Sequence, residues 1–253
     1  MLRKHALTIS FVVTWAVVLG ATAHAGIAPQ HAPVLGAAPI ANSNAKSAPV
    51  VAAVLIGDAD LGGPNDFLFT YDKTGVNHAG TIATSPVGDA TKLEVPLSSM
   101  KTGWYASHWN VQSADGHMAG GDDGLWWAFG VKGITRAAAT KKISLSTPTP
   151  VASLPNKISA SVNGVRVGTR TISVVLKTGT ITSFKWQRLD EVPSTLIGAS
   201  FPWAVSFQKK TKTFVSTGVI PFSGSYKLTA QITLARNGES HTALWSAVIA
   251  VSP

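Results

Sequence analysis

Short apolar runs separated by turn residues constrain the fold of this chain more than any other feature. Amphipathic helical periodicity is nearly absent, whereas Gly, Ser, Thr and Val are abundant. Runs of this kind, bounded by Gly, Asp and Asn, are typical of strands in an all-β protein. In the first half we predict strands over residues 49–56, 66–71, 92–97, 104–111 and 125–131. The last of these is apolar throughout, which predicts burial on both faces.

The second half repeats these strand signals after a change in composition. The segment STPTP at 146–150 resembles a linker. An Asn-Gly pair predicts a hairpin within 160–167, and a second Asn-Gly pair predicts one between 225–234 and 242–251. Two further alternating runs, 171–176 and 183–188, predict strands. The fold class predicted is all-β, with two antiparallel Ig-like/Greek-key β-sandwich domains at 31–133 and 150–253, joined by a linker at 134–149.

The N-terminal segment predicts export. Arg3 and Lys4 precede an apolar run over 6–19, and small residues follow. This pattern is typical of a secretory signal peptide, which we assign to residues 1–30. The apolar run is shorter than the roughly 20 residues that cross a bilayer, and no later stretch qualifies. We therefore expect a periplasmic protein with no membrane span once the signal is removed.

Three cleavage positions stay open. Ala21-Thr22-Ala23 predicts cleavage before His24, and Ala23-His24-Ala25 predicts cleavage before Gly26. A later cleavage before His31 is the third alternative. The choice decides which residue carries the free amino group.

Composition narrows the classes of function. The chain has no cysteine, so a hydrophobic core must stabilise the fold without disulfides. The net charge is +9, but the basic residues are scattered, so we expect no nucleic-acid partner. No Ser-His-Asp spacing, paired acids or Gly-rich phosphate loop is evident, and we expect no enzymatic activity.

Asp115 and His117 are the candidate metal ligands that chemistry alone suggests. Side chains two positions apart on an extended chain point the same way. Imidazole with carboxylate, in the absence of cysteine, suits Cu(II), Ni(II) or Zn(II). The alternative is an ordinary Asp-Gly turn followed by an exposed histidine.

The surrounding residues resemble a known family. Tyr105, Trp109, Ser113, Asp115 and His117 form Y-x-x-x-W-x-x-x-S-A-D-G-H. This resembles the signature of the CopC family of periplasmic copper-binding (copper resistance) proteins, over about residues 31–133. The family's mature chain begins with histidine, and His31-Ala32 followed by Pro39 and Pro49 is similar to that start.

The resemblance implies a CopC-like first domain that binds Cu(II). The implied ligands are His31, Asp115 and His117, with His24 as the alternative N-terminal ligand. A free amino group with its own imidazole, a second imidazole and a carboxylate form a tetragonal N,O set, which suits Cu(II). Two departures are the ambiguous cleavage and the absence of a methionine-rich loop, since only Met100 and Met118 follow the signal. We expect no separate Cu(I) site.

The leading hypothesis is a protein of copper homeostasis or resistance that buffers copper or delivers it to an inner-membrane copper transporter. One alternative is a copper-dependent oxidative enzyme with a histidine brace. The other is a metal-free exported scaffold or adhesion protein. The remaining histidines are weighed as non-ligands: His108 as packing or surface, His78 in a loop, and His241 at the surface. Of Trp126 and Trp127, we expect one ring to face solvent.

Overall fold

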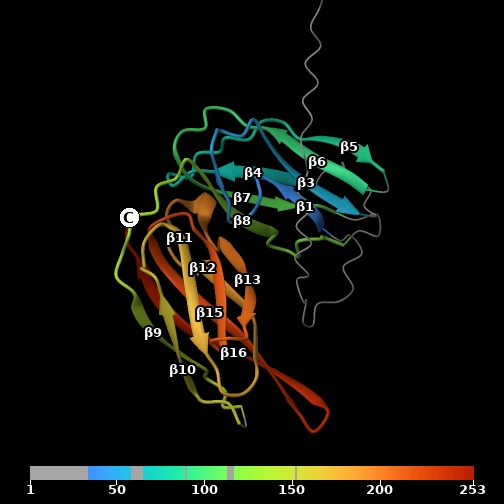
Figure 1. The fold of residues 1–253 in the computed structure, drawn as a ribbon. Helices are drawn as coiled ribbons and strands as arrows, with labels where there is room; N and C mark the ends of the chain where they lie inside the picture. Colours follow the sequence, from blue (N-terminus) through green and yellow to red (C-terminus); the bar gives the residue numbers. More distant parts are fainter. Residues whose placement is uncertain (1–33, 58–64, 89, 113–116, 152) are drawn as a thin grey trace, which may run out of the picture.

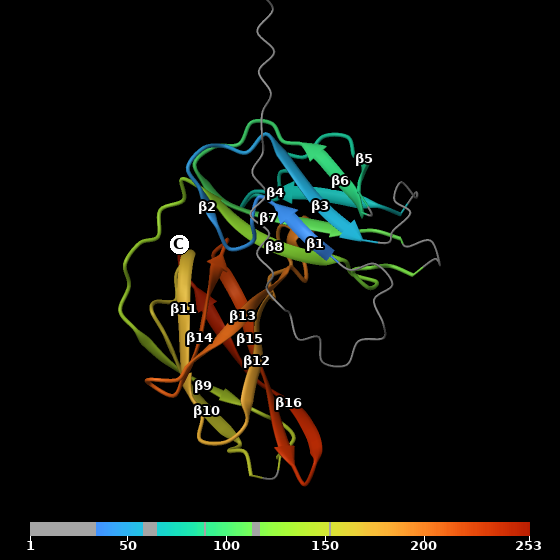
Figure 2. The same cartoon turned by 45° about the vertical axis from the view of Figure 1, so that its right-hand side comes forward.

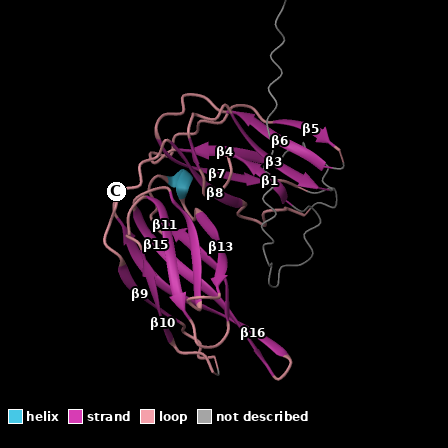
Figure 3. Cartoon of the chain, viewed as in Figure 1, coloured by secondary structure: helices cyan, strands magenta, loops and turns pink. Residues whose placement is uncertain are grey.

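The computed structural model describes residues 34–57, 65–88, 90–112, 117–151 and 153–253, and its strands account for nearly all regular structure (Figures 1 and 3). The predicted signal peptide, residues 1–30, lies outside the described residues, as do His24, His31 and Asp115. Among the described residues no helix is long and apolar enough to cross a membrane.

The first half forms two four-stranded sheets packed face to face, here called the sandwich. One sheet has the order β1-β3-β6-β5 and the other β2-β8-β7-β4. All pairings in them are antiparallel except β2 with β8. The strands are β1 Val34–Ala38, β2 Asn44–Ala45, β3 Val51–Gly57, β4 Phe67–Tyr71, β5 Ala83–Val87, β6 Ala90–Pro96, β7 Gly103–Asn110 and β8 Leu125–Val131.

The second half forms one sheet that closes on itself, here called the closed sheet. Its order is β10-β11-β14-β13-β12-β15-β16-β9, and the pairing of β9 with β10 completes the ring. The strands are β9 Lys141–Ser146, β10 Lys157–Val162, β11 Gly168–Val175, β12 Thr180–Arg188, β13 Ser200–Gln208, β14 Thr213–Ile220, β15 Gly224–Arg236 and β16 Glu239–Val251, with a short 3-10 helix at Ser194–Leu196.

The all-β fold class is confirmed, and the strand predicted at 125–131 coincides with β8. The turn at Asn237-Gly238 is also as predicted. Arg236 pairs with Glu239, and the two turn residues have φ of 53° and 81°, which a type I′ turn requires. The other predicted hairpin is looser, because β10 ends at Val162 and β11 begins only at Gly168.

The predicted linker is wrong in part. Residues 141–146 lie within 134–149 but form β9, which pairs with β10 along its whole length. Ile143 and Leu145 alternate with exposed neighbours and enter the core of the closed sheet. The chain therefore joins its second sheet before the Ser-Thr-Pro segment that had suggested a linker.

The sandwich and the closed sheet pack directly on each other (Figure 2). Trp104 and Trp126, on the outer face of the β7–β8 sheet, belong to the same apolar cluster as Phe201 of β13. The Trp126 and Phe201 rings meet edge to face with centroids 6.5 Å apart. The prediction that Trp126 or Trp127 faces solvent is wrong, since their exposed fractions are 7 % and 6 %. The closed sheet covers the face that a two-layer sandwich would leave to water.

Candidate metal centre at the end of β7

Strand β7 carries the candidate motif and is fixed on both faces. Tyr105 and Trp109 enter the core of the sandwich, whereas Trp104 and Ala106 enter the cluster shared with the closed sheet. Between them, the Ser107 hydroxyl lies 2.8 Å from that of Thr70 on β4, in a buried hydrogen bond. The alternation of large side chains thus holds the strand that leads into the motif.

Backbone pairing joins the chain just before residues 113–116 to the chain just after them. Gln112 and Met118 form an isolated antiparallel bridge, and the Ala119 N–H donates to the Val111 carbonyl at 2.8 Å. From the β4 side, the Asp66 carboxylate accepts the Gln112 N–H at 2.7 Å. These contacts fix the two points at which the chain enters and leaves residues 113–116.

His117 is the one predicted ligand among the described residues. It is exposed and directly precedes the bridge at Met118. Within the described part of the chain, no group of three His, Asp or Glu side chains is placed to hold a metal ion. His117 is therefore positioned, while its proposed companions, His31 and Asp115, lie outside the described residues.

Buried Asn110 holds the turn that follows the motif. Its side-chain oxygen accepts the Val111 and Gly120 N–H groups at 3.0 and 2.8 Å, and its amide donates to the Gly121 carbonyl at 2.7 Å. Gly124, at φ +70°, closes this turn, and a Cβ there would lie 2.7 Å from the Trp109 carbonyl oxygen. Sequence reasoning did not single out Asn110, although a polar residue ending an apolar strand was a signal for it.

His108 packs on the opposite face of β7 from Trp109, as predicted. Its ring stacks on Trp126 with centroids 4.0 Å apart and planes 5° apart, and Nε2 lies 2.7 Å from the Asp123 carbonyl oxygen. Burial lowers the pKa of His108, and the hydrogen bond and the charge of Asp123 oppose this only in part. His108 therefore serves packing, and its burial disfavours the protonated form of the ring.

The start of β1 lies at the same end of the sandwich as the motif. Val34 pairs with Ile56 near the end of β3, and Phe67 at the start of β4 pairs with Asn110 at the end of β7. β3 ends at Gly57 in one sheet, and β4 begins at Phe67 in the other. The start of β1 and the end of β7 therefore lie at the same end of the sandwich (Figures 1 and 2).

Two further histidines, His78 and His241, lie away from this end. His78 follows β4, and its ring nitrogens lie 3.0 Å from the Ser98 carbonyl and 3.2 Å from the Asp72 carboxylate. The pKa of Asp72 is lowered: burial alone would raise it, but hydrogen bonds from Thr74, His78 and Val76 outweigh burial. His241 is a surface residue of the β15–β16 hairpin, as predicted, 3.6 Å from Glu239.

Two hollows among the described residues lie away from the proposed ligands. A cavity of about 650 Å³ at the start of β7 is lined by both units, including His78, Trp104 and Phe222. Sequence reasoning missed it, because its walls come from segments far apart in the chain.

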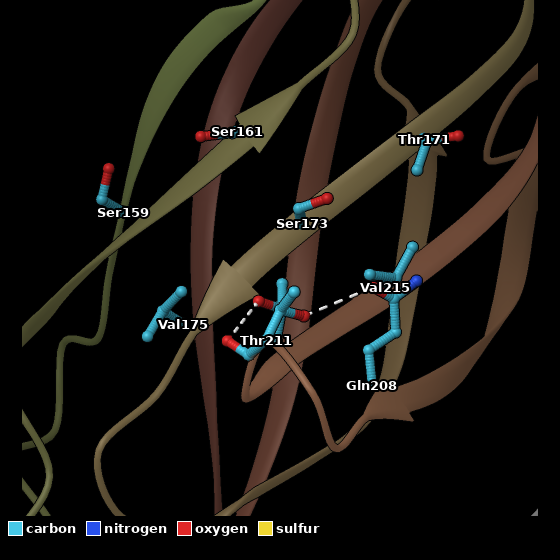
Figure 4. Close-up of a pocket in the computed structure, with 9 residues that line it drawn as sticks. Ser159, Ser161, Thr171, Ser173, Val175, Gln208, Thr211 and Val215 are labelled. Carbon is cyan, nitrogen blue, oxygen red and sulfur yellow. Dashed lines mark hydrogen bonds between the residues drawn. The ribbon is translucent and has the colours of Figure 1, made fainter.

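The other hollow is a shallow depression of about 700 Å³ on the closed sheet (Figure 4). Its described lining carries hydroxyl, amide and valine side chains but no charged or aromatic one, so we assign it no chemistry. The lining residues are Ser159, Ser161, Thr171, Ser173, Val175, Gln208, Thr211, Thr213 and Val215.

Comparison with known proteins gives structural similarity at low identity. No protein-family model and no curated protein matches the chain. The chain is similar to the crystal structure of CopC from Methylosinus trichosporium OB3b, with 18 % identity and a TM-score of 0.35 over 43 % of this chain and all of that one.

Two further solved structures span more of this chain. A pullulanase from Anoxybacillus sp. LM18-11 gives 10 % identity and a TM-score of 0.24 over 83 % of this chain and 25 % of its own. The titin fragment A168–A169 gives 12 % identity and a TM-score of 0.18 over 84 % of this chain and 94 % of its own. At these TM-scores and identities, the similarities carry no argument about function.

Proposed function

We propose that this chain is a periplasmic Cu(II)-binding protein that buffers copper or delivers it to an inner-membrane copper transporter. The proposed ligands are His117, Asp115 and an N-terminal histidine, His31 or alternatively His24. The site serves binding and carries out no catalysis. Its nitrogen and carboxylate donors form the kind of set that Cu(II) prefers in a tetragonal geometry.

The observation that carries the proposal is that the start of β1 and the end of β7 lie at one end of the sandwich. Val34 is paired next to the end of β3, and β7 ends at Asn110 on the facing sheet. Only three peptide units separate His31 from Val34, a span of at most about 10 Å. His117 immediately precedes the bridge at the base of the motif. His31 is thus joined to β1, and His117 to the bridge that follows β7, by short lengths of chain.

The rigidity of the scaffold also supports binding at this position. The chain enters and leaves the motif at points fixed by the Gln112–Met118 bridge, and Asn110 holds the following turn. A site whose supporting residues are locked by packing and hydrogen bonds needs less ordering when the metal arrives. Copper bound here would be an exchangeable cargo, held by donor atoms of this chain.

The test uses the exported protein. Its intact mass identifies the N-terminal residue, and Cu(II) titration with electron paramagnetic resonance reports the number of bound ions and the coordinated nitrogens. We expect one tightly bound Cu(II), lost in Asp115→Ala and His117→Ala. His241→Ala is the matched control, because it removes an exposed imidazole far from the motif. Since the ligand nitrogens must be deprotonated, the affinity should fall in acid.

Further variants separate the alternatives. His31→Ala and His24→Ala show which histidine is the N-terminal ligand, and the one at the mature terminus should reduce nitrogen ligation. Binding that is unchanged in both motif variants would refute the proposed site. Oxidised oligosaccharides released in the presence of copper and a reductant would instead favour a histidine-brace enzyme.

A further inference from the structure

The cavity at the start of β7 lies at the opposite end of that strand from the motif. Its walls come from the loop after β4, the start of β7, the connector after β8 and the β14–β15 loop, so both units are needed to form it. Its volume of about 650 Å³ falls within the range of small-molecule sites, which occur preferentially at interfaces between domains.

The floor of the cavity is apolar and held in place. Trp104 packs so closely on Gly133 that a Cβ at that glycine would lie 2.6 Å from the indole. The Phe222 carbonyl accepts the Tyr226 hydroxyl at 3.0 Å, which fixes the β14–β15 loop. Ile134, 73 % exposed, also lines the cavity and leaves a large aliphatic side chain uncovered. These side chains form a preformed apolar surface on which the apolar part of a ligand can pack.

Three cations line the same cavity without an acidic partner. Lys73, Lys101 and Arg136 are exposed, and none forms an ion pair with any residue that the structure describes. The backbone of two of them, Lys101 and Arg136, is held by hydrogen bonds. The Tyr105 hydroxyl accepts the Lys101 N–H at 2.8 Å and donates to its carbonyl at 2.9 Å, while the Arg136 carbonyl accepts from Arg170.

The lining also carries one acidic side chain, Asp72, which forms no ion pair with these three cations. Asp72 accepts hydrogen bonds from the Thr74 N–H and hydroxyl and from the Val76 N–H, and its second oxygen pairs with His78. Pro253 also lines the cavity, and its oxygen accepts the Arg166 Nε–H at 3.0 Å.

A further positive charge lies behind the wall. Arg170 is 1 % exposed, and its guanidinium binds only backbone carbonyls, including those of Arg136 and Val167. The cations of the lining outnumber its one acidic side chain, and an excess of one sign of charge above a low-dielectric wall concentrates ions of the opposite sign.

We propose that this cavity binds a small organic anion that joins a carboxylate or comparable acidic group to an apolar body. The acidic group lies between Lys101 and Arg136, and the apolar body lies on Trp104, Phe222 and Ile134. This site is distinct from the proposed copper site, since none of its lining residues is a proposed copper ligand.

The test uses the full-length exported protein after removal of metal by a chelator. The probe is 8-anilinonaphthalene-1-sulfonate, an aromatic anion whose fluorescence rises in apolar surroundings. We compare the wild type with the Lys101→Met/Arg136→Met double variant, whose replaced side chains are exposed. The matched control is Lys185→Met, an exposed lysine on β12 away from the cavity. Thermal unfolding shows that all variants are folded, and decanoate and decanol serve as competitors with equal chain length.

We expect saturable binding of one dye, weakened about tenfold, or about 1.4 kcal/mol, in the double variant and unchanged in Lys185→Met. Decanoate should displace the dye at least about tenfold more effectively than decanol. Hydrogen exchange should show protection at residues 99–104 and 221–223. Equal affinity in the double variant, equal displacement by both competitors, or protection confined to other segments would overturn the proposal, whatever the outcome for copper.

Discussion

Arg170→Met is the substitution whose cost can be worked out most directly from the structure. Arg170 lies on β11 with 1 % of its surface exposed. Its guanidinium donates to four backbone carbonyls, those of Arg166 at 2.9 Å, Val167 at 3.0 Å, Arg136 at 2.9 Å and Asn163 at 3.4 Å. It therefore ties the loop between β10 and β11 to the connector that leaves the sandwich.

The magnitude follows from these bonds and from the burial of the charge. Methionine keeps much of the apolar volume but donates nothing, so three good bonds and one long one are lost. Each bond from a charged donor contributes ~1.5–3 kcal/mol. Against this, removing the guanidinium recovers the cost of burying it beside Arg166, which is also why its pKa is lowered. With the loop carbonyls partly returned to water, we expect a net loss of ~2–4 kcal/mol.

Urea denaturation followed by tryptophan fluorescence measures the free energy of unfolding. Lys185→Met removes an exposed charge from the same closed sheet and should change stability by less than ~0.5 kcal/mol. Arg170→Lys keeps the charge but cannot reach all four carbonyls. Its loss in free energy of unfolding should therefore lie between those of Lys185→Met and Arg170→Met. Amide exchange in residues 134–138 should accelerate in Arg170→Met. A stability within ~0.5 kcal/mol of the wild type would refute the assignment of Arg170 as the tie between connector and loop.

Three shorter predictions concern the junction and the β15–β16 turn. Because burial lowers the pKa of His108, the folded protein resists its protonation, and stability should fall as the pH drops below ~6.5; thermal unfolding of the metal-free His108→Gln variant should lose this part of the pH dependence. Gly238→Val places a β-branched residue at φ +81°, so Tm should fall, corresponding to a cost of ~1–2 kcal/mol, whereas Gly36→Ala, with no atom near its Cβ, is the mild control. Trp126→Ala should cost ~3–5 kcal/mol in urea denaturation, and a double-mutant cycle with Phe201→Ala should give a coupling energy, since the two rings meet across the junction. No coupling would contradict a shared core.

Sequence periodicity predicted the central strands well, because the burial of alternate side chains determines both the sequence pattern and the position of the strand. The predicted strand at 104–111 appears as β7, and the prediction of burial on both faces of 125–131 is confirmed by β8. Period-2 patterns fail where a strand is short or edge-like. β1 begins at Val34 with exposed or half-buried residues, and β5 at 83–87 shows little burial, so neither gave a clear signal.

What the sequence could not predict was the second partner of the β7–β8 sheet. An apolar strand indicates burial on both faces but not what covers each face. One of the rings of Trp126 and Trp127 was therefore expected to face solvent, whereas both are buried. The cavity at the junction follows from that same packing, so it was missed too. The ligand set at the motif stays a prediction, because His117 is positioned while Asp115 lies outside the described residues.

Strand β7 connects the two proposed sites without providing a switch between them. One face of the strand is packed into the sandwich through Tyr105 and Trp109, and the other is packed against the closed sheet through Trp104 and Ala106. Coupling between sites requires an element with two arrangements that both ligands bias. A strand buried on both faces has one arrangement, because a shift by one residue would exchange its two sets of side chains between different cores. For that reason we regard copper binding at the end of β7 and anion binding at its start as independent properties of one rigid scaffold.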